Sequence, residues 1–241
     1  MVDRSDKRPA LIGSNPRVVH VYELGTTNYE DVHRLQRRLQ AQRRDGAGVD
    51  SLLVTEHRPV LTLGRSHPEP NLRVAPQVVA NYGIQVHQTE RGGDITYHGP
   101  GQLVAYGIID LRSWDCSVLD YVTGLEETVV GVLGDWGVRG ERSALGRGVW
   151  TKGKKIAALG INVRRWVTMH GIALNVDPDM SHFDLINPCG MPDIEVTSLA
   201  HEIGKKVPVD AVTESFMFHF KRVFECTAQT EDMSKRAIGD R

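Results

Sequence analysis

The sequence has little cysteine: three residues in 241, at positions 116, 189 and 226. Three cysteines so far apart do not predict a disulfide framework, and no C-x-x-C pair or Cys/His cluster indicates a zinc site. A chain without structural disulfides is typical of a reducing compartment, either the cytoplasm of a bacterium or the mitochondrial matrix of a eukaryote. We therefore expect neither a disulfide nor a metal cofactor.

Long apolar runs and an excess of charge of one sign are missing as well. No run approaches the roughly 18 residues that a transmembrane helix needs, and no secretory signal is visible. The net charge is −1, so no strong overall field favours nucleic acid or an anionic membrane. We expect a soluble protein that binds neither of them.

No internal repeat and no long Gly/Ser linker divides the chain, which predicts a single domain. We place this domain at residues 18–228, between polar tails at 1–17 and 229–241 that we expect to be disordered. Apolar patterns of both strand and helix type alternate along it. The expected fold class is therefore α+β, with a sizeable β-sheet.

Apolar spacing places the expected elements, with strands at 18–22, 102–111, 156–163 and 169–176 and helices at 118–136 and 212–223. The strand at 102–111 is almost continuously apolar, as suits a strand buried on both faces. Thr27 with Glu30 predicts a capping box for an early helix. Thr197 is expected to cap a short helix that Gly204 ends.

Cys189 lies in the run Asn187-Pro188-Cys189-Gly190. Proline fixes its own φ and restricts the residue before it, and glycine lets a ligand or a strained backbone come close. Such a turn presents a sulfur to a substrate better than it fills a core, where free cysteine packs as a small hydrophobe. Cys189 is a candidate nucleophile on this pattern.

The segment 91–102 is the densest run of special residues, with four glycines and a proline. Such a backbone either turns sharply or lets a ligand lie against it, so both a tight hairpin and a ligand-lining loop are open. It is not a G-x-G-x-x-G motif, and no dinucleotide site follows. The candidate lining residues here are Arg91, Gly92, Gly93, Asp94, Ile95, Thr96, Tyr97 and His98.

Residues 148–155 nearly spell a phosphate-binding loop but fail as one. Lys155 stands where the motif needs a Ser or Thr hydroxyl, and a strand-like run follows where a helix N-terminus is needed. Lys155 enters an apolar strand from a turn, so it is either a lysine that extends to solvent at a sheet edge or a buried base.

Small residues recur on the two expected strands at 156–163 and 169–176. Ala158, Gly160, Gly171 and Ala173 would leave a slot between neighbouring strands, which an extended apolar substrate could fill. His170 precedes this run and is, as a lone histidine, more typical of a structural residue than of a catalyst.

Taken in order, the motifs RGGDITYHGPGQ, GVW with KIAALG, HGIALN, NPCG and VTSL resemble the lipoyl(octanoyl) transferase family. The resemblance runs from about Val18 to Val223. It implies a fold of the biotin/lipoate protein ligase catalytic type, with a mixed sheet flanked by helices. One position departs from the family pattern: the usual H-P-P reads His57-Arg58-Pro59 here.

The resemblance also implies an activity and a site. Members transfer an octanoyl group from octanoyl-acyl carrier protein to one lysine of a lipoyl domain, in 2-oxoacid dehydrogenase complexes or the glycine cleavage H protein, without a cofactor. By motif, Cys189 would carry the acyl thioester and Lys155 would be its partner. The acyl site would be lined by residues 91–98 together with Ala158, Leu159, Gly160, Gly171, Ile172 and Ala173.

Thioester exchange needs a thiolate, which a nearby ammonium group favours, and it needs no ATP because the donor is already activated. Three alternatives stay open. An ATP-dependent lipoate or biotin protein ligase would share the fold but need a nucleotide loop and no cysteine. A non-catalytic acyl-binding module would need the slot alone, and a cysteine hydrolase would use water as the acceptor.

Overall fold

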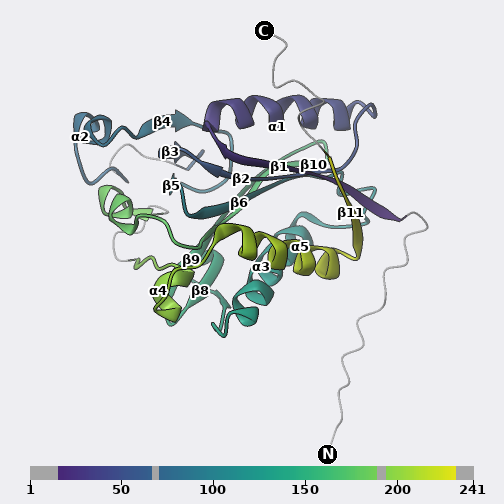
Figure 1. Ribbon diagram of the computed structural model, residues 1–241. Coiled ribbons are helices and arrows are strands. Elements are labelled where there is room, and N and C mark those ends of the chain that lie inside the picture. The colour runs from purple at the N-terminus through teal and green to yellow at the C-terminus, as the bar shows by residue number, and fades with distance from the viewer. Residues whose placement is uncertain (1–15, 67–70, 189–193, 232–241) are drawn as a thin grey trace, which may run out of the picture.

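The computed structural model describes residues 16–66, 71–188 and 194–231, which form one mixed α+β domain (Figure 1). A large sheet runs through its centre, α1 covers one face, and α3 and α5 cover the other. A small sheet with α2 lies at one end. None of the described helices is long and apolar enough to cross a membrane.

The large sheet has eight strands. In spatial order they are β11 (Cys226–Thr230), β1 (Arg17–Thr27), β2 (Ser51–His57), β6 (Gln102–Ile108), β10 (Val167–Asn175), β9 (Lys154–Arg164), β8 (Gly146–Thr151) and β7 (Glu141–Ser143). The pairs β11–β1 and β1–β2 are parallel, and the other neighbours are antiparallel. The expected strands at 102–111, 156–163 and 169–176 thus lie side by side as β6, β9 and β10.

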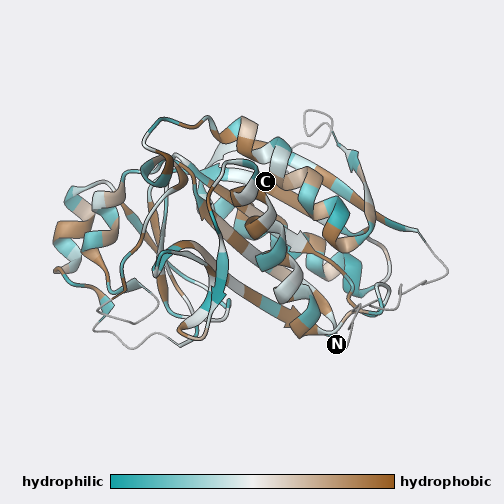
Figure 2. Cartoon of the chain, turned by 90° about the horizontal axis from the view of Figure 1, so that it is seen from below, coloured by the Kyte–Doolittle hydropathy of each residue, from teal (hydrophilic) through white to brown (hydrophobic). Residues whose placement is uncertain are grey.

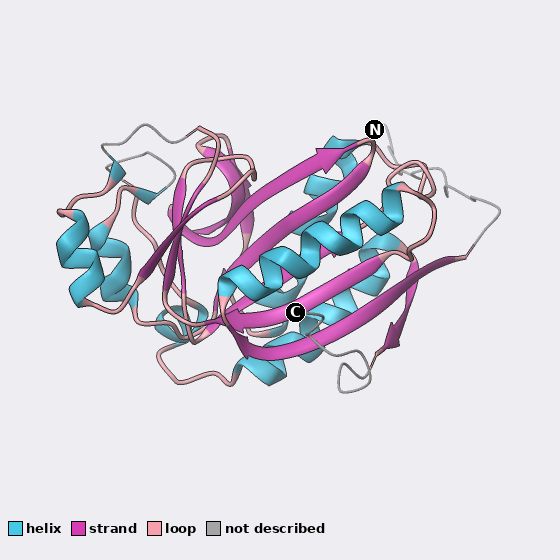
Figure 3. Cartoon of the chain, turned by 90° about the horizontal axis from the view of Figure 1, so that it is seen from above, coloured by secondary structure: helices cyan, strands magenta, loops and turns pink. Residues whose placement is uncertain are grey.

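The small sheet has three strands in the order β4 (Gln85–Gln88), β3 (Val60–Leu63) and β5 (Ile95–His98). It packs with α2 (Pro76–Asn81) and the short 3₁₀ helix η2 (Met180–Leu185) around its own hydrophobic cluster. Figure 3 shows the small sheet at one end of the large sheet, beyond the end of α1.

Helix α1 (Tyr29–Arg44) lies across one face of the large sheet. Its buried side chains include Tyr29, Val32 and Leu35, which pack on Leu53 and Val104 of the sheet. Two buried glutamines of α1 also hydrogen-bond β10, so the helix is fixed to the sheet by polar as well as apolar contacts.

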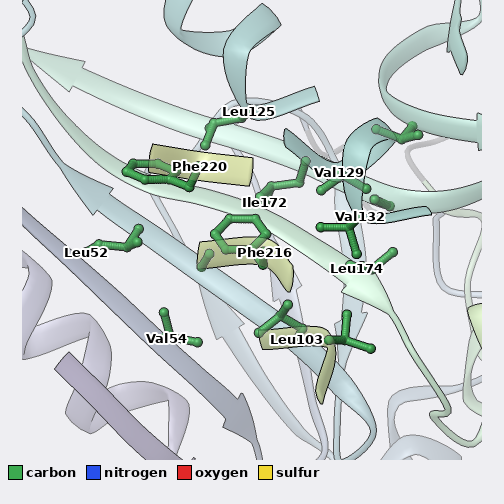
Figure 4. Close-up of a cluster of buried hydrophobic side chains, with 14 of the residues drawn as sticks. Leu52, Val54, Leu103, Leu125, Val129, Val132, Ile172, Leu174, Phe216 and Phe220 are labelled. Carbon is green, nitrogen blue, oxygen red and sulfur yellow. The ribbon is translucent and has the colours of Figure 1, made fainter. Parts of the chain in front are cut away.

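Helices α3 (Val118–Asp135) and α5 (Val209–Phe224) cover the opposite face, and α4 (Leu199–Ile203) lies near the end of this layer. Seen from this side, hydrophobic and hydrophilic residues alternate along the helices, as expected for helices with one buried face (Figure 2). Their buried side chains meet Leu52, Leu103, Ile172 and Leu174 in the main core (Figure 4).

Two helix caps differ from the prediction. Thr27 ends β1, where its hydroxyl lies 2.8 Å from that of Thr55, and Asn28 is the N-cap residue of α1, without a side-chain cap bond. Helix α4 is capped by Ser198 rather than Thr197, whose hydroxyl instead donates to Glu202. Thr27 thus has a partner on a neighbouring strand, which local spacing does not reveal, whereas Thr197 binds a side chain of the helix that it precedes.

Strand β11 also departs from the prediction, because Gln229 and Thr230 belong to it and not to a tail. They are held by parallel pairing with β1, in which Arg17 lies opposite Cys226. A partner about 200 residues away leaves no local signal. The remaining tail residues, 1–15 and 232–241, lie outside the described residues.

The main core gives a direct test of this architecture. Phe216 is 1% exposed in the α5 layer, whereas Phe218, on the same helix, is 59% exposed. Replacing Phe216 by Ala should lower the free energy of unfolding by about 3–5 kcal/mol through lost burial and a residual cavity. The same change at Phe218 should stay within about 0.5 kcal/mol. Urea unfolding of both variants checks this, and equal losses would contradict the assigned faces.

Candidate active site

A narrow cavity of about 40 Å³ lies between the α1 face of the large sheet and the small sheet. We call it the slot. Its walls are Tyr29, Arg91, Gly93, Asp94, Ile95, Thr96, His98, Val104, Tyr106, Ala158, Leu159, Gly160, His170, Gly171, Ile172 and Ala173.

Small side chains on paired strands create the floor of the slot. Gly160 of β9 lies opposite Gly171 of β10, and Ala158 lies opposite Ala173. On the next strand, Tyr106 pairs with Gly171 and Val104 with Ala173. The slot therefore runs across three strands, from β9 over β10 to β6, which is about 10 Å at ordinary strand spacing.

Arg91 holds the small sheet in place over this floor. Its Nη2 donates to the Thr62 carbonyl oxygen at 2.6 Å and to the Thr62 hydroxyl at 2.9 Å, so the buried guanidinium is fixed to β3. The next residue, Gly92, donates its backbone N–H to the Ile161 carbonyl of β9 at 2.9 Å. One dipeptide thus links the two sheets.

This link depends on a close approach that only glycine permits. A Cβ on Gly160 would lie 2.7 Å from the Gly92 carbonyl oxygen and 3.3 Å from Arg91 Cδ. Both are closer than ordinary van der Waals contact, so the missing side chain at position 160 lets the 91–93 segment lie against β9.

The β6 end of the slot is aromatic and polar. His57 Nε2 lies 2.9 Å from the Tyr106 hydroxyl, and His98 Nδ1 lies 2.6 Å from Gln102 Oε1. Tyr29 stacks parallel to His98. Burial lowers the pKa of His57 to about 3, with His98 adding to the effect, and lowers that of His98 to about 4. Both rings are therefore neutral at pH 7.

Lys155 lies in an adjoining cavity and is not part of the slot wall. This second cavity is lined by Gly92, Gly93, Val118, Leu119, Val122, Gly146, Arg147, Lys155, Leu159, Gly160 and Ile161. Gly93, Leu159 and Gly160 line both spaces. The two cavities therefore meet at the edge of β9.

The side chain of Lys155 is buried, so of the two sequence interpretations the solvent-reaching one is wrong. The residue is 5% exposed, and its Nζ lies 5.3 Å from the centre of the Trp150 ring. Lys155 follows the turn at Lys152-Gly153, where both residues have positive φ and join β8 to β9. Residues 148–155 thus form a β-hairpin, in agreement with the rejection of a phosphate-binding loop.

Cys189 falls in 189–193, outside the described residues. The described chain resumes at residue 194, and there it lies beside Lys155. The Lys155 N–H donates to the Glu195 carbonyl at 2.8 Å, and the Thr197 N–H donates to the Lys155 carbonyl at 2.9 Å. Pro188, Ile194 and Glu195 line one hollow on the surface.

Two of the predicted lining residues lie elsewhere. Gly92 faces the adjoining cavity, and Tyr97 packs in the cluster of the small sheet with its hydroxyl 2.8 Å from His182 Nδ1. Tyr97 lies on the face of β5 opposite to that of Thr96 and His98, which border the slot. The other predicted lining residues border the slot.

Four further residues border the slot although the sequence did not assign them to it: Tyr29, Val104, Tyr106 and His170. Val104 and Tyr106 alternate along β6, so they share a face, but only the pairing of β6 with β10 places that face over the slot. Tyr29 comes from α1, whose contact with this face has no local sequence signal.

The close approach at Gly160 predicts that a methyl group there is costly. Gly160→Ala should lower the free energy of unfolding by about 1–3 kcal/mol, because the 91–93 segment must move. Gly134→Ala is the matched control, since a Cβ there would meet nothing within 4 Å. It should be neutral or stabilising by up to about 1 kcal/mol. Thermal or urea unfolding measures both, and equal effects would argue against the close approach.

The buried neutral histidines predict sensitivity to acid. The pKa values of His57 and His98 are lower in the folded chain than the 6.5 of a free histidine. The unfolded chain therefore binds more protons below about pH 6.5, and stability present above that pH is lost as the pH falls towards 4. The slope should be roughly 1 kcal/mol per pH unit for each histidine.

Urea unfolding between pH 7 and pH 5 measures this slope. Burial lowers the pKa of His33 and His170 as well, so His57→Gln should remove only the share of its own ring. A His20→Gln control, where His20 pairs with Glu231, should keep all the buried contributions. A free energy of unfolding that stays constant between pH 7 and pH 5 would contradict the neutral state of the His57 and His98 rings.

Comparison with known proteins places this geometry in a family. Residues 28–221 match the family model described as the lipoyl protein ligase A/B catalytic domain. A protein of Syntrophobacter fumaroxidans named octanoyltransferase is 45% identical over 209 residues, covering 87% of this chain and 92% of that protein. An octanoyltransferase of Chloroflexus aggregans is 44% identical, covering 87% and 96% respectively.

Solved structures show the same fold at low identity. Lipoate-protein ligase A bound with ATP superposes with a TM-score of 0.71 at 15% identity, covering 93% of this chain and 92% of that one. A bipartite lipoate protein ligase of Thermoplasma acidophilum, solved with its E2 lipoyl domain, gives a TM-score of 0.66 at 16% identity, covering 91% and 89%. The sequence relatives and the family model together show that this chain belongs to the lipoyl(octanoyl) transferase family of acyltransferases.

Proposed function

We propose that this enzyme transfers an octanoyl group from octanoyl-acyl carrier protein to a lysine of a lipoyl domain, through a thioester on Cys189. The observation that carries the proposal is an apolar slot three strands wide that adjoins a cavity holding a buried lysine. The slot suits an extended medium-length acyl chain, and its floor is made of small residues. The junction at Gly93, Leu159 and Gly160 lets the acyl chain pass from one space to the other.

The chemistry takes two thioester steps. The Cys189 thiolate, stabilised by the Lys155 ammonium group, attacks the donor carbonyl. A new S–C bond forms, the S–C bond to the carrier breaks, and the carrier leaves as a thiol with the proton that Lys155 gives up. The acceptor lysine amine then attacks the Cys189 thioester, so that an N–C bond forms and the S–C bond to Cys189 breaks. Lys155, now neutral, takes the proton of the attacking amine, which restores the ammonium–thiolate pair.

The surroundings of Lys155 support this role. A buried ammonium over an aromatic ring has fewer water contacts than a surface lysine, and such lysines are used as bases. Its backbone pairs with residues 195–197, which follow the 189–193 segment closely in the chain. Cys189 therefore precedes by only six positions the residue, Glu195, that is hydrogen-bonded to the backbone of Lys155.

Burial of the acyl chain would supply part of the binding free energy. Each methylene contributes about 0.8 kcal/mol on burial, so an octanoyl chain contributes roughly 5 kcal/mol before other costs. The neutral His57 and His98 near the β6 end suit an uncharged guest. A ligand with a charged carboxylate would bind with that group away from these rings, towards the cavity of Lys155.

The acceptor is proposed from the relatives. One structural neighbour was solved with an E2 lipoyl domain, and the sequence relatives are named octanoyltransferase. Lipoyl domains of 2-oxoacid dehydrogenase complexes and the glycine cleavage H protein are the acceptors we propose. The acyl carrier protein as donor follows from the thioester chemistry, since no activation step is then required.

The alternative is an ATP-dependent ligase, because a lipoate-protein ligase bound with ATP shares the fold. Mixing the protein with octanoyl-acyl carrier protein, without ATP or magnesium, separates the two. Intact-mass analysis should show one added octanoyl group, and peptide mapping should place it on Cys189. Acyl groups only on Cys116 or Cys226, or a strict need for ATP with free octanoate, would contradict the proposal.

Lys155 can be tested with a neighbouring lysine as the control. Lys155→Ala should slow transfer to a lipoyl domain by about 10²–10⁴-fold, and Lys155→Arg should not restore it because a guanidinium does not release its proton at neutral pH. Lys152→Ala removes a lysine that is ion-paired with Glu202 on the surface and should leave the rate nearly unchanged. Rapid-quench kinetics measures all three, and normal turnover in Lys155→Ala would reject the role.

A further inference from the structure

A group of metal-ligating side chains lies behind the slot and takes no part in the proposed transfer. His33 of α1, Glu90 before β5 and His170 of β10 offer ligand atoms that all lie within 4.8 Å of one another. His33 Nε2 is 2.8 Å from Glu90 Oε2, and His170 Nε2 is 3.9 Å from the same oxygen. Among the described residues, this is the one set of at least three His, Cys, Asp or Glu side chains that lie close enough together to hold a metal ion.

His170 is the informative member. Its side chain is 2% exposed, and neither ring nitrogen has a hydrogen-bond partner. A buried polar ring without partners is unfavourable unless a ligand satisfies it. The backbone of His170 is held in an unusual conformation, with φ at 62°, and its N–H donates to Gln36 of α1. The ring is thus held in place facing Glu90 while both of its nitrogens lack partners.

From this geometry we propose that His33, Glu90 and His170 bind a divalent transition-metal cation such as Zn²⁺. Metal–nitrogen and metal–oxygen bonds of about 2.0–2.2 Å let two ligand atoms on one cation lie up to roughly 4 Å apart. The two separations to Glu90 fit this limit, and the ligand atoms of the two histidines lie within 4.8 Å of each other. Two imidazoles and one carboxylate form a ligand set that zinc and iron(II) use.

The surroundings fit three protein ligands and an open position. Arg37 donates to both oxygens of Glu90, from Nε to Oε1 at 3.0 Å and from Nη2 to Oε2 at 3.3 Å, and this pair holds the carboxylate beside the histidines. His170 also borders the slot, so the open position faces that space. The positive charge of Arg37 limits the affinity.

The three ligands come from three parts of the chain. His33 lies on α1, Glu90 precedes the Arg91–Gly92 link, and His170 lies on the slot floor. A bound cation would join the helix, the link and the sheet, and it would set the depth of the slot beside His170. Binding would therefore raise the temperature of unfolding as well as give a defined stoichiometry.

The test uses the full chain with Cys189 replaced by Ala, so that metal on the reactive thiol is not counted. Zn²⁺ is titrated by calorimetry against this protein and against Glu90→Gln and His33→Gln versions of it. About one Zn²⁺ per chain is expected, with at least tenfold weaker binding in both variants. A His20→Gln control, on strand β1 and outside the proposed ligand group, should bind like the parent.

A second measurement does not depend on how the variants fold. Co²⁺ added to the parent protein should give the visible bands of nitrogen and oxygen ligation without thiolate charge-transfer bands, and it should raise the unfolding temperature. Absence of saturable binding, thiolate bands, or equal affinity in Glu90→Gln and the parent would overturn the proposal. Transfer activity is not a readout here, so failure of the metal site leaves the proposed function untouched.

Discussion

The dipeptide Arg91–Gly92 is the connection on which the candidate site depends. The side chain of Arg91 binds β3 through Thr62, and the backbone of Gly92 binds β9 through Ile161. Because a buried guanidinium needs several acceptors, the small sheet has one favourable position over the large sheet. The two sheets share no strand, and Gln102 of β6 adds a second connection through its bonds to Tyr97 and His98 of β5.

This connection also explains why the slot floor consists of small residues. Gly160 must lack a side chain for the 91–93 segment to approach β9, and the facing Gly171 lies against the Ala105 backbone on its other side. A single close approach thus gives the slot its shape, and three of the residues around it also line the Lys155 cavity. The aromatic end at β6 is kept neutral by burial, which makes the whole slot suited to an apolar guest.

Local signals predicted part of this arrangement. The strands β6, β9 and β10, the hairpin before Lys155 and the small residues of the floor follow from residue type and spacing. Tyr29 and Tyr106 could not be placed, because their positions depend on which strands pair and on where α1 lies. Strand β11 and the cap at Asn28 were missed for the same reason: long-range partners decided them. Cys189, the central residue of the proposed chemistry, lies outside the described residues, so its role rests on motif and on the position of Lys155.

We propose that the acyl chain lies across the slot, with its thioester end near Gly160 and its last carbon beside β6. An octanoyl thioester analogue with a photoreactive diazirine at its last carbon tests this position, after loading on the enzyme, irradiation and peptide mapping. Labelling is expected on the residues at the aromatic end, namely Tyr29, His98, Val104 or Tyr106. Labelling confined to Val118, Leu119 or Val122 in the Lys155 cavity would contradict it.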